Sequence, residues 1–272
     1  MRASVRSLAA LPTLVTLGNA FCGFLAVTYV LEAIASGPST EGFYLGLEKA
    51  VWAILVAMVF DFMDGKVARL TGTESAFGVQ IDSLSDVISF GLCPALLFKT
   101  LGQFEFGISP KGSLVLACFY LFGAVLRLAR FNVEAEAEDD HRSFKGLPSP
   151  AAAAGVAAIV YLYAHHSLPT SDDILPNDVV RSYVRSVFPY VVTLLGILMW
   201  TKFPYIHAAN VLLTERRHPS HLLAVLATIG IVAWYPPLAI SVLMLAYAFS
   251  GPVLYVWNIS TGRTTVEGES IL

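Results

Sequence analysis

The sequence is poor in charged residues, and this scarcity argues against a soluble domain. Only 14% of the 272 residues are charged, whereas 56% are hydrophobic and the mean hydropathy is +0.67. An average soluble domain has about 25% charged residues. The formal net charge of -3 also leaves no basic excess that would favour nucleic acid as a partner. The composition therefore predicts a protein of the lipid bilayer with no nucleic-acid partner.

Cysteine is also scarce. Cys22, Cys93 and Cys118 stand singly inside apolar segments, without the spacing of a zinc site or of a disulfide framework. The first apolar run, from about Leu8 to Leu31, is too long and too poor in a small-residue cleavage site to resemble a removable signal peptide. We therefore interpret it as a retained span and not as a signal peptide.

Apolar runs long enough for a spanning helix, which needs about 20 residues, predict an all-α, polytopic transmembrane helix bundle. We expect eight spans, at 8–32, 46–69, 83–101, 112–131, 149–167, 187–203, 221–235 and 237–257. Pro236 and Pro237 cannot continue a helix, so they indicate a tight reversal between the last two spans, or one bent hairpin. The segment 168–185 is expected to be a loop with a short helix. The whole chain, 1–272, is interpreted as one membrane domain with extra C-terminal helices at 187–257.

The distribution of basic residues predicts the orientation of the bundle. With eight spans, both termini lie on one side of the membrane, and the 17 basic residues divide 12 to 5 in favour of that side. By the positive-inside rule this side faces the cytoplasm. The acidic run 134–141 then reads as a solvated loop and not as a metal site.

Four carboxylates stand at the predicted cytoplasmic ends of the second and third helices. Asp61 and Asp64 are three residues apart and Asp82 and Asp86 are four apart, so each pair shares one helix face. Four converging acids repel one another, and an acid at membrane depth costs about 2.5 to 3.5 kcal/mol, which indicates a cation between them. Carboxylates without a neighbouring His or Cys favour Mg²⁺ or a similar hard ion over zinc.

Small residues and one arginine accompany these acids. Gly65, Ala68 and Gly78 would leave backbone open to a ligand, although small residues in membrane helices also serve helix packing. Packing alone leaves the nearby Arg69 unexplained, and the planar guanidinium group of arginine suits a phosphate.

The spacing of these residues resembles the signature of the CDP-alcohol phosphotransferase family. The matching positions lie within 61–86: Asp61, Asp64, Gly65, Ala68, Arg69, Gly78, Asp82 and Asp86. The resemblance implies a catalytic site in which the four aspartates hold two divalent cations, Mg²⁺ or Mn²⁺. It also implies that Asp86 acts as the general base.

The same resemblance implies a binding pocket for a CDP-linked lipid. Its lining would comprise Asp61, Gly65, Ala68, Arg69, Gly78 and Asn19. Asn19 matches the family pattern in the first helix, whereas Thr13 stands where the family often has Asn after "LP".

Within the family, the chain resembles the integral-membrane phosphatidylserine synthases. The stretches that carry this narrower likeness lie within 1–165: "LVTLGNAFCGFLAV", "DSLSDVISFGLCPA", "RLARFNVE" and "FKGLPSPAAAAG". They imply CDP-diacylglycerol and L-serine as substrates, and a homodimer. Serine carries a carboxylate and an ammonium group, so its pocket should contain a cation and an acceptor. The candidates are Arg127, Arg130, Asn132 and Lys145, although both arginines could instead anchor the helix end at lipid headgroups.

The sequence is also compatible with three other functions. The acceptor could be another alcohol, such as glycerol phosphate or inositol, or the donor could be an archaeal-type lipid. A cation transporter with intramembrane acids is a reading from another class, which Arg69 disfavours because its positive charge would repel the transported ion.

Overall fold

The structure, a computed structural model, describes residues 2–71, 75–136, 146–168, 176–201, 203, 205 and 234–260, and within these ranges every regular element is a helix. Six helical stretches there are long and apolar enough to cross a membrane: Pro12–Ser36, Glu41–Val67, Ala76–Phe104, Pro110–Val133, Asn177–Trp200 and Pro236–Trp257. The helix Ser149–His165 is apolar but shorter. The predicted all-α, multispanning membrane class is thus confirmed. The span expected at 221–235 falls almost entirely outside the described residues.

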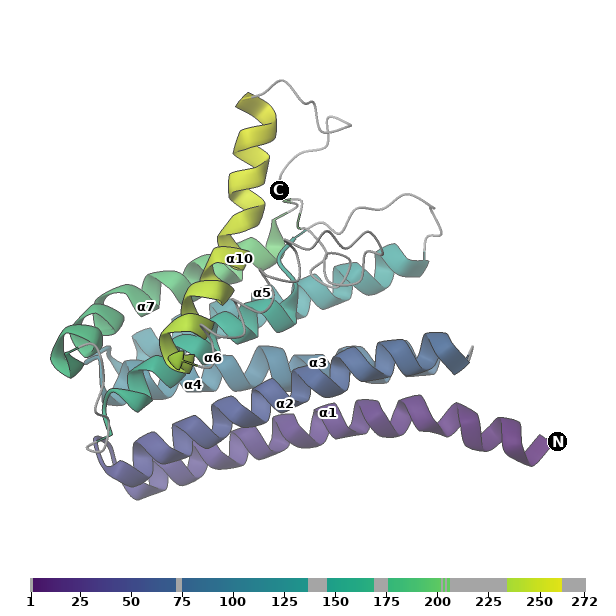
Figure 1. Ribbon diagram of the computed structural model, residues 1–272, viewed down its shortest axis with the longest axis horizontal. Helices are drawn as coiled ribbons and strands as arrows, with labels where there is room; N and C mark the ends of the chain where they lie inside the picture. Colours follow the sequence, from purple (N-terminus) through teal and green to yellow (C-terminus); the bar gives the residue numbers. More distant parts are fainter. Residues whose placement is uncertain are drawn as a thin grey trace.

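Helices α1 (Arg2–Ser36) and α2 (Glu41–Thr71) form an antiparallel hairpin along one edge of the bundle (Figure 1). The reversal uses Gly37 and Ser39, both with positive φ angles of 88° and 59°. Thr40 then caps α2, since its Oγ1 accepts a 3.1 Å hydrogen bond from the backbone N–H of Phe43. This short turn brings the two apolar helices into contact over most of their length.

Helix α3 (Ala76–Asp86) continues through the π-helical segment η1 (Val87–Leu92) into α4 (Cys93–Phe104), so that 76–104 forms one rod. Ser75 caps the rod, because its Oγ accepts a 3.0 Å bond from the backbone N–H of Gly78. In the π segment the carbonyl of Phe90 accepts a 3.1 Å bond from the Tyr120 hydroxyl. π segments often mark functional sites, and this one begins directly after Asp86.

Four further helices complete the described bundle: α5 (Pro110–Glu136), α6 (Ser149–His165), α7 (Asn177–Trp200) and α10 (Pro236–Ser260). The alanine-rich α6 lies at the centre, in contact with α2, α4, α5, α7 and α10, and most of its residues are buried. Small side chains permit this close packing. Figure 1 shows α7 and α10 on the side of the bundle away from α1.

Several helices begin before the residues expected from the sequence: α2 begins at Glu41 and α3 at Ala76, where 46 and 83 were expected. Helix α7 begins at Asn177, so the short helix expected within 168–185 is continuous with the span that was expected to start at 187. Val180 and Val184 are buried, one turn apart, and continue the apolar face of the helix that was expected to start at 187. Pro236 and Pro237 lie at the start of α10, where proline is well tolerated.

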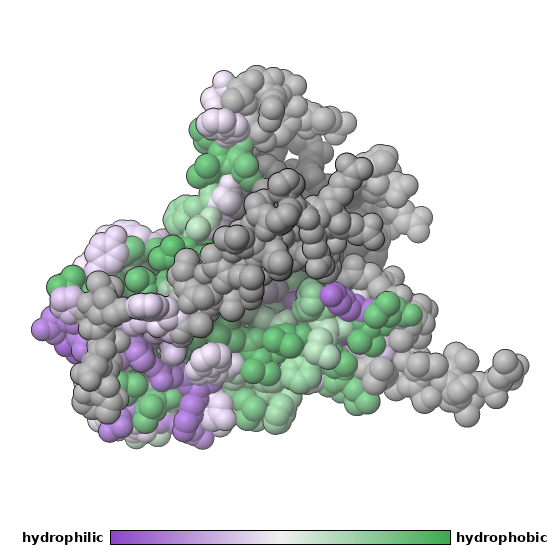
Figure 2. Space-filling view, in the orientation of Figure 1, coloured by the Kyte–Doolittle hydropathy of each residue, from purple (hydrophilic) through white to green (hydrophobic). Residues whose placement is uncertain are grey.

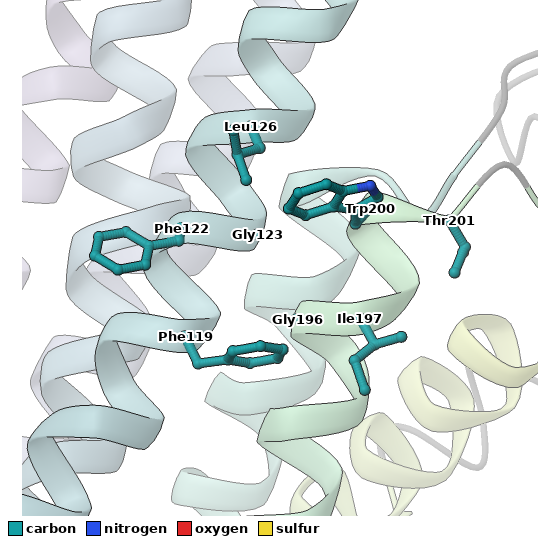
Figure 3. Close-up of a pocket in the computed structure, with 8 residues that line it drawn as sticks. All are labelled: Phe119, Phe122, Gly123, Leu126, Gly196, Ile197, Trp200 and Thr201. Atoms are coloured by element: carbon teal, nitrogen blue, oxygen red, sulfur yellow. The ribbon is translucent and has the colours of Figure 1, made fainter. Parts of the chain in front are cut away.

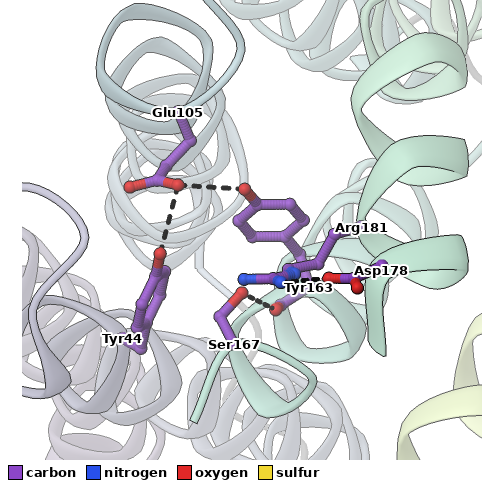
Figure 4. Close-up of polar contacts among 6 residues, drawn as sticks. All are labelled: Tyr44, Glu105, Tyr163, Ser167, Asp178 and Arg181. Atoms are coloured by element: carbon purple, nitrogen blue, oxygen red, sulfur yellow. Dashed lines mark hydrogen bonds and ion pairs between the residues drawn. The ribbon is translucent and has the colours of Figure 1, made fainter. Parts of the chain in front are cut away.

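A polar cluster closes the end of the bundle that contains the α1–α2 turn (Figure 4). The carboxylate of Glu105 accepts hydrogen bonds from the hydroxyls of Ser39, Tyr44 and Tyr163, at 2.8, 3.1 and 3.0 Å. These bonds connect the end of α4 to the α1–α2 hairpin and to α6. The acidic residues of the sequence motif lie toward the other end of α2.

Helices α5 and α7 cross at two glycines. A Cβ atom added to Gly123 would lie 2.6 Å from the carbonyl oxygen of Gly196, so the backbones approach closely there. An apolar groove of about 330 Å³ opens beside the crossing, between Phe119, Leu126 and Trp200 (Figure 3). Figure 2 shows hydrophobic side chains spread over much of the visible described surface, as expected for a protein that faces lipid.

Candidate active site

Three of the four motif carboxylates converge. Asp61 and Asp64 on α2 and Asp82 on α3 each offer a carboxylate oxygen, and these oxygens all lie within 4.8 Å of one another. Asp64 is buried, and the other two are half-buried. The spacing of the acids in the sequence predicted two acids on one face of each helix. Helices α2 and α3 both pack against α1, and Asp61, Asp64 and Asp82 come together there.

The cluster has the properties of a cation site. Asp64 Oδ2 and Asp82 Oδ1 are both buried without a hydrogen-bond partner in the described part of the chain. Buried charged oxygens that lack a donor are strongly unfavourable unless a cation is present. Several carboxylate oxygens, with no sulfur or imidazole in the group, are the donors preferred by hard divalent ions.

Asp86, the fourth acid, is held by the first helix. Its Oδ1 accepts a 3.0 Å hydrogen bond from Asn19 Nδ2, and the backbone carbonyl of Asn19 accepts a 3.0 Å bond from Ser89 Oγ. The Asn19 Oδ1 atom is buried without a hydrogen-bond partner among the described residues. Asp86 is not part of the three-residue group, but it interacts electrostatically with Asp61 and Asp82, so it lies at the edge of the same acidic cluster.

Arg127 on α5 is a positively charged residue close to these acids. Its charge interacts electrostatically with Asp61 and Asp86, and its Nη1 donates a 2.9 Å bond to Ser149 Oγ at the start of α6. The Nε atom of Arg127 is buried and has no hydrogen-bond partner in the described chain. The guanidinium group therefore retains a free donor close to the acidic cluster.

The other candidates for a serine pocket have different environments. Asn132 exchanges hydrogen bonds with Ser83, the residue after Asp82, at 2.9 and 3.1 Å, which ties α5 to α3 beside the acids. Arg130 Nη1 instead donates a 2.7 Å bond to the carbonyl of Trp200 at the end of α7. Lys145 lies outside the described residues.

Two glycines of the signature are described. Gly65 follows Asp64 and is half-buried. Gly78 lies in the first turn of α3, where an added Cβ would have one close neighbour among the described residues, Ser75 Oγ at 3.2 Å. Space beside the helix backbone suits the approach of a ligand. The side chains of Ala68 and Arg69 lie outside the described residues.

Sequence reasoning overlooked Ser89 and assigned no role to the contact between Arg127 and Ser149. Ser89 lies three residues after Asp86, on the same helical face, which is the signal that could have identified it. Its partner is 70 residues away in the sequence, so no local pattern indicates the bond.

The chain is similar to one family model and to several known proteins. The family model described as CDP-alcohol phosphatidyltransferase matches residues 9–202. A CDP-diacylglycerol–serine O-phosphatidyltransferase of Helicobacter pylori is 32% identical over 247 residues, which cover 90% of this chain and 91% of the relative. An archaetidylserine synthase of Methanothermobacter thermautotrophicus is 35% identical over 166 residues, 60% of this chain and 62% of the relative. A CDP-diacylglycerol–serine O-phosphatidyltransferase of Bacillus subtilis is 29% identical over 153 residues, 56% and 76% of the two chains.

Proposed function

We propose, from the premise that this chain belongs to the CDP-alcohol phosphatidyltransferase family, that it transfers the phosphatidyl group of CDP-diacylglycerol to the hydroxyl of L-serine. The products would be phosphatidylserine and CMP. The convergence of Asp61, Asp64 and Asp82 within 4.8 Å carries the catalytic part of the proposal. The H. pylori relative, similar over nine-tenths of both chains, supports serine as the acceptor.

Two divalent cations, Mg²⁺ or Mn²⁺, would be held by Asp61, Asp64 and Asp82, with Asp86, at the edge of this group, as the fourth ligand. Bound there, the ions would neutralise the charge of the diphosphate and of the departing CMP. Asp64 Oδ2 and Asp82 Oδ1 support this assignment, because both are buried without a hydrogen-bond partner among the described residues and each would gain a positive partner.

Asp86 would act as the general base. A serine hydroxyl is a weak nucleophile at neutral pH, so a carboxylate within hydrogen-bond reach must accept its proton as the oxygen attacks phosphorus. Oδ1 of Asp86 accepts a bond from Asn19, and the second oxygen of the same carboxylate would receive the proton. The new bond joins the serine oxygen to the lipid-side phosphorus, and the bond from that phosphorus to CMP breaks.

The CDP group would bind across the ends of α2 and α3. By their positions in the family signature, Asp61, Gly65, Ala68, Arg69 and Gly78 would line this pocket. Asn19 of α1, which the family resemblance also places there, is fully buried against Asp86, so it would support the pocket from behind without touching the nucleotide. The space beside Gly78 supports a close approach of the nucleotide to the helix backbone.

The serine carboxylate would bind Arg127. The Nε atom of Arg127 is buried and has no hydrogen-bond partner among the described residues, and the charge of the guanidinium group interacts with Asp86. A charged hydrogen bond to a carboxylate would satisfy this donor. Asn132, beside Ser83, would supply an acceptor for the ammonium group of serine. Arg130 and Lys145 would add positive charge near the serine pocket.

The site would face the cytoplasm, with both termini on the same side. The 12 to 5 division of basic residues supports this orientation. Serine and CMP would exchange with cytosolic water, while the lipid donor would enter from the adjacent leaflet. A homodimer is the expected assembly, as the family resemblance implies and as is common for oligomers.

A second donor has specific support from one relative. The archaetidylserine synthase matches 60% of this chain, so a CDP-linked archaeal lipid is the alternative to CDP-diacylglycerol with the same acceptor.

One assay tests the proposal and its rivals. Purified protein is incubated with CDP-diacylglycerol or its archaeal counterpart, radiolabelled serine and Mg²⁺ or Mn²⁺, and lipid-bound label and CMP are measured. We expect labelled phosphatidylserine and equimolar CMP, both abolished by a chelator. CMP release with glycerol phosphate or inositol, but not with serine, would overturn the choice of acceptor. Metal uptake into vesicles without CMP release would support a transporter instead.

A further inference from the structure

A chain of hydrogen bonds through Asn19, Ser89 and Asp86 joins α1 to the rod formed by residues 76–104. Ser89 Oγ donates to the Asn19 carbonyl at 3.0 Å, and Asn19 Nδ2 donates to Asp86 Oδ1 at 3.0 Å. The orientation of the amide follows from the chemistry, since a carboxylate oxygen accepts and only the nitrogen of Asn donates. Asn19 is thereby held at its backbone and at its side chain.

All three residues are removed from solvent. Asn19 and Ser89 are 0% exposed and Asp86 is 6% exposed. A side chain with no accessible surface has no free face for a substrate, whereas Asp86 keeps a small opening. The arrangement therefore differs from that of a pocket-lining asparagine.

The backbones of α1 and η1 are packed closely around this chain of bonds. A Cβ atom added to Gly23, one turn after Asn19, would lie 2.5 Å from Ser89 Oγ and 3.2 Å from Ser89 Cα. The carbonyl of Gly23 also accepts a 3.1 Å bond from Cys93 Sγ. On the other side, Tyr120 of α5 holds the π segment through the Phe90 carbonyl. This packing restricts movement of Asn19 relative to the helix that carries Asp86.

We propose that Asn19 and Ser89 are positioning residues for Asp86: the Asn19 amide fixes the carboxylate of Asp86, and Ser89 fixes Asn19. The inference rests on the proposed function, in which Asp86 is the base. With Oδ1 held by the amide, the carboxylate directs its second oxygen to the attacking hydroxyl. Misplacement of a catalytic group by about 1 Å can lower the rate about 100-fold, while binding of the CDP-linked donor depends on other residues.

The experiment compares Asn19→Ala, Ser89→Ala and the double variant with the wild-type chain. We expect Asn19→Ala to lower kcat about 10- to 100-fold and Ser89→Ala about 3- to 10-fold. Because Ser89 acts through Asn19, the double variant should lie within about twofold of Asn19→Ala alone. Equilibrium binding of CDP-diacylglycerol, measured with Mg²⁺ and without serine, should change less than about threefold in every variant, which also shows that the variants fold.

Ser85→Ala is the matched control. Ser85 is also buried on the same rod, but its Oγ bonds to the Ile81 carbonyl of its own helix, at 2.9 Å. Its removal should leave kcat and donor binding unchanged.

Two results would overturn the positioning role while the proposed function stands. One is a loss of donor affinity in Asn19→Ala with unchanged kcat, which would make Asn19 a nucleotide contact. The other is a double variant whose kcat loss equals the product of the single losses, which would indicate two independent structural defects. If the wild-type chain uses another alcohol, serine is not the acceptor, and the kcat ratios of variant to wild type are measured with that alcohol instead. A wild-type chain that releases no CMP with any alcohol would overturn both proposals.

Discussion

Arg127 and Ser149 are joined by a 2.9 Å hydrogen bond from Nη1 to Oγ, between α5 and the first residue of α6. Ser149 is fully buried, so the bond fixes one arm of the guanidinium group inside the bundle. The charge of the guanidinium group interacts electrostatically with Asp61 and Asp86. A membrane arginine that is anchored in this way has a fixed place beside the acids, which a surface arginine at a headgroup would not have.

Replacement of Arg127 should therefore affect the acceptor. We expect Arg127→Gln to raise the KM for serine about tenfold or more, because loss of a charged hydrogen bond costs about 1.5 to 3 kcal/mol. Arg127→Lys should recover only part of the affinity, since an ammonium group cannot reproduce the planar donor geometry. Steady-state kinetics at saturating CDP-diacylglycerol measure the effect, and an unchanged KM in Arg127→Gln would remove Arg127 from the serine pocket.

Arg130 provides a comparison on the same helix. Its Nη1 is bonded to the Trp200 carbonyl, so part of its donor capacity is used at the end of α7. We expect Arg130→Gln to raise the KM for serine less than Arg127→Gln does, by about two- to fivefold, because a peripheral charge contributes about 1 kcal/mol or less. A KM equal to that of the wild type would withdraw Arg130 from the pocket.

Asp86→Asn should abolish most of the turnover. An amide cannot accept the hydroxyl proton, and loss of a general base typically lowers the rate about 100- to 10,000-fold. Binding of CDP-diacylglycerol should be largely retained, as measured by equilibrium binding without serine. Asp178→Asn, at an exposed carboxylate that pairs with Arg181, is the control and should keep full activity. Turnover retained by Asp86→Asn would dismiss the base.

Metal binding should stabilise the folded chain. Asp61, Asp64 and Asp82 repel one another without a cation, and a ligand at 100 times its Kd adds about 2.7 kcal/mol of stability. We expect Mg²⁺ to raise the Tm of the chelator-treated protein in detergent, measured by thermal unfolding. Asp61→Asn should unfold at a higher temperature than the wild type without metal, because one repelling charge is gone, and should show a smaller shift with Mg²⁺. Equal shifts in both proteins would contradict a metal at this cluster.

The polar cluster at the other end of the bundle should matter for stability alone. Glu105→Ala leaves the hydroxyls of Ser39, Tyr44 and Tyr163 without their common acceptor, at a cost of about 1 to 3 kcal/mol for a buried group. Thermal unfolding should show a lower Tm, with kcat unchanged. Ser39→Ala removes only an exposed donor and should have little effect. A fall in kcat at a temperature where Glu105→Ala is fully folded would mean that the two ends of the bundle are coupled.

The crossing of α5 and α7 should not tolerate a side chain. Gly123→Ala places a Cβ 2.6 Å from the Gly196 carbonyl, so the helices must separate, at about 1 to 3 kcal/mol for overpacking. Gly155→Ala is the matched control in α6, where the nearest atom to an added Cβ is a Leu195 methyl carbon at 3.4 Å. It should be neutral or slightly stabilising, because alanine favours a helix over glycine. Equal Tm values for the two variants would contradict the close crossing.

The sequence anticipated most of the described helices because membrane spans are determined by length and hydrophobicity. The expected span at 112–131 lies inside α5, and that at 237–257 lies inside α10. The start of α7 was misplaced because Asp178, Arg181 and Arg185 lower the hydropathy of its first turns, although its other face is buried. A hydropathy criterion misses the part of a span that carries polar residues on one face, although such residues do not prevent the helix from forming.

The sequence by itself determined that Asp61 and Asp64 share a face of one helix and that Asp82 and Asp86 share a face of another. Helical periodicity fixes such relationships locally, within one or two turns. Only the tertiary structure decided that Asp61, Asp64 and Asp82 meet, that Asn19 holds Asp86, and that Arg127 lies beside them on α5. These relationships depend on how separate helices pack, and close packing of small residues such as Gly23 selects one arrangement among several that the same apolar helices would permit.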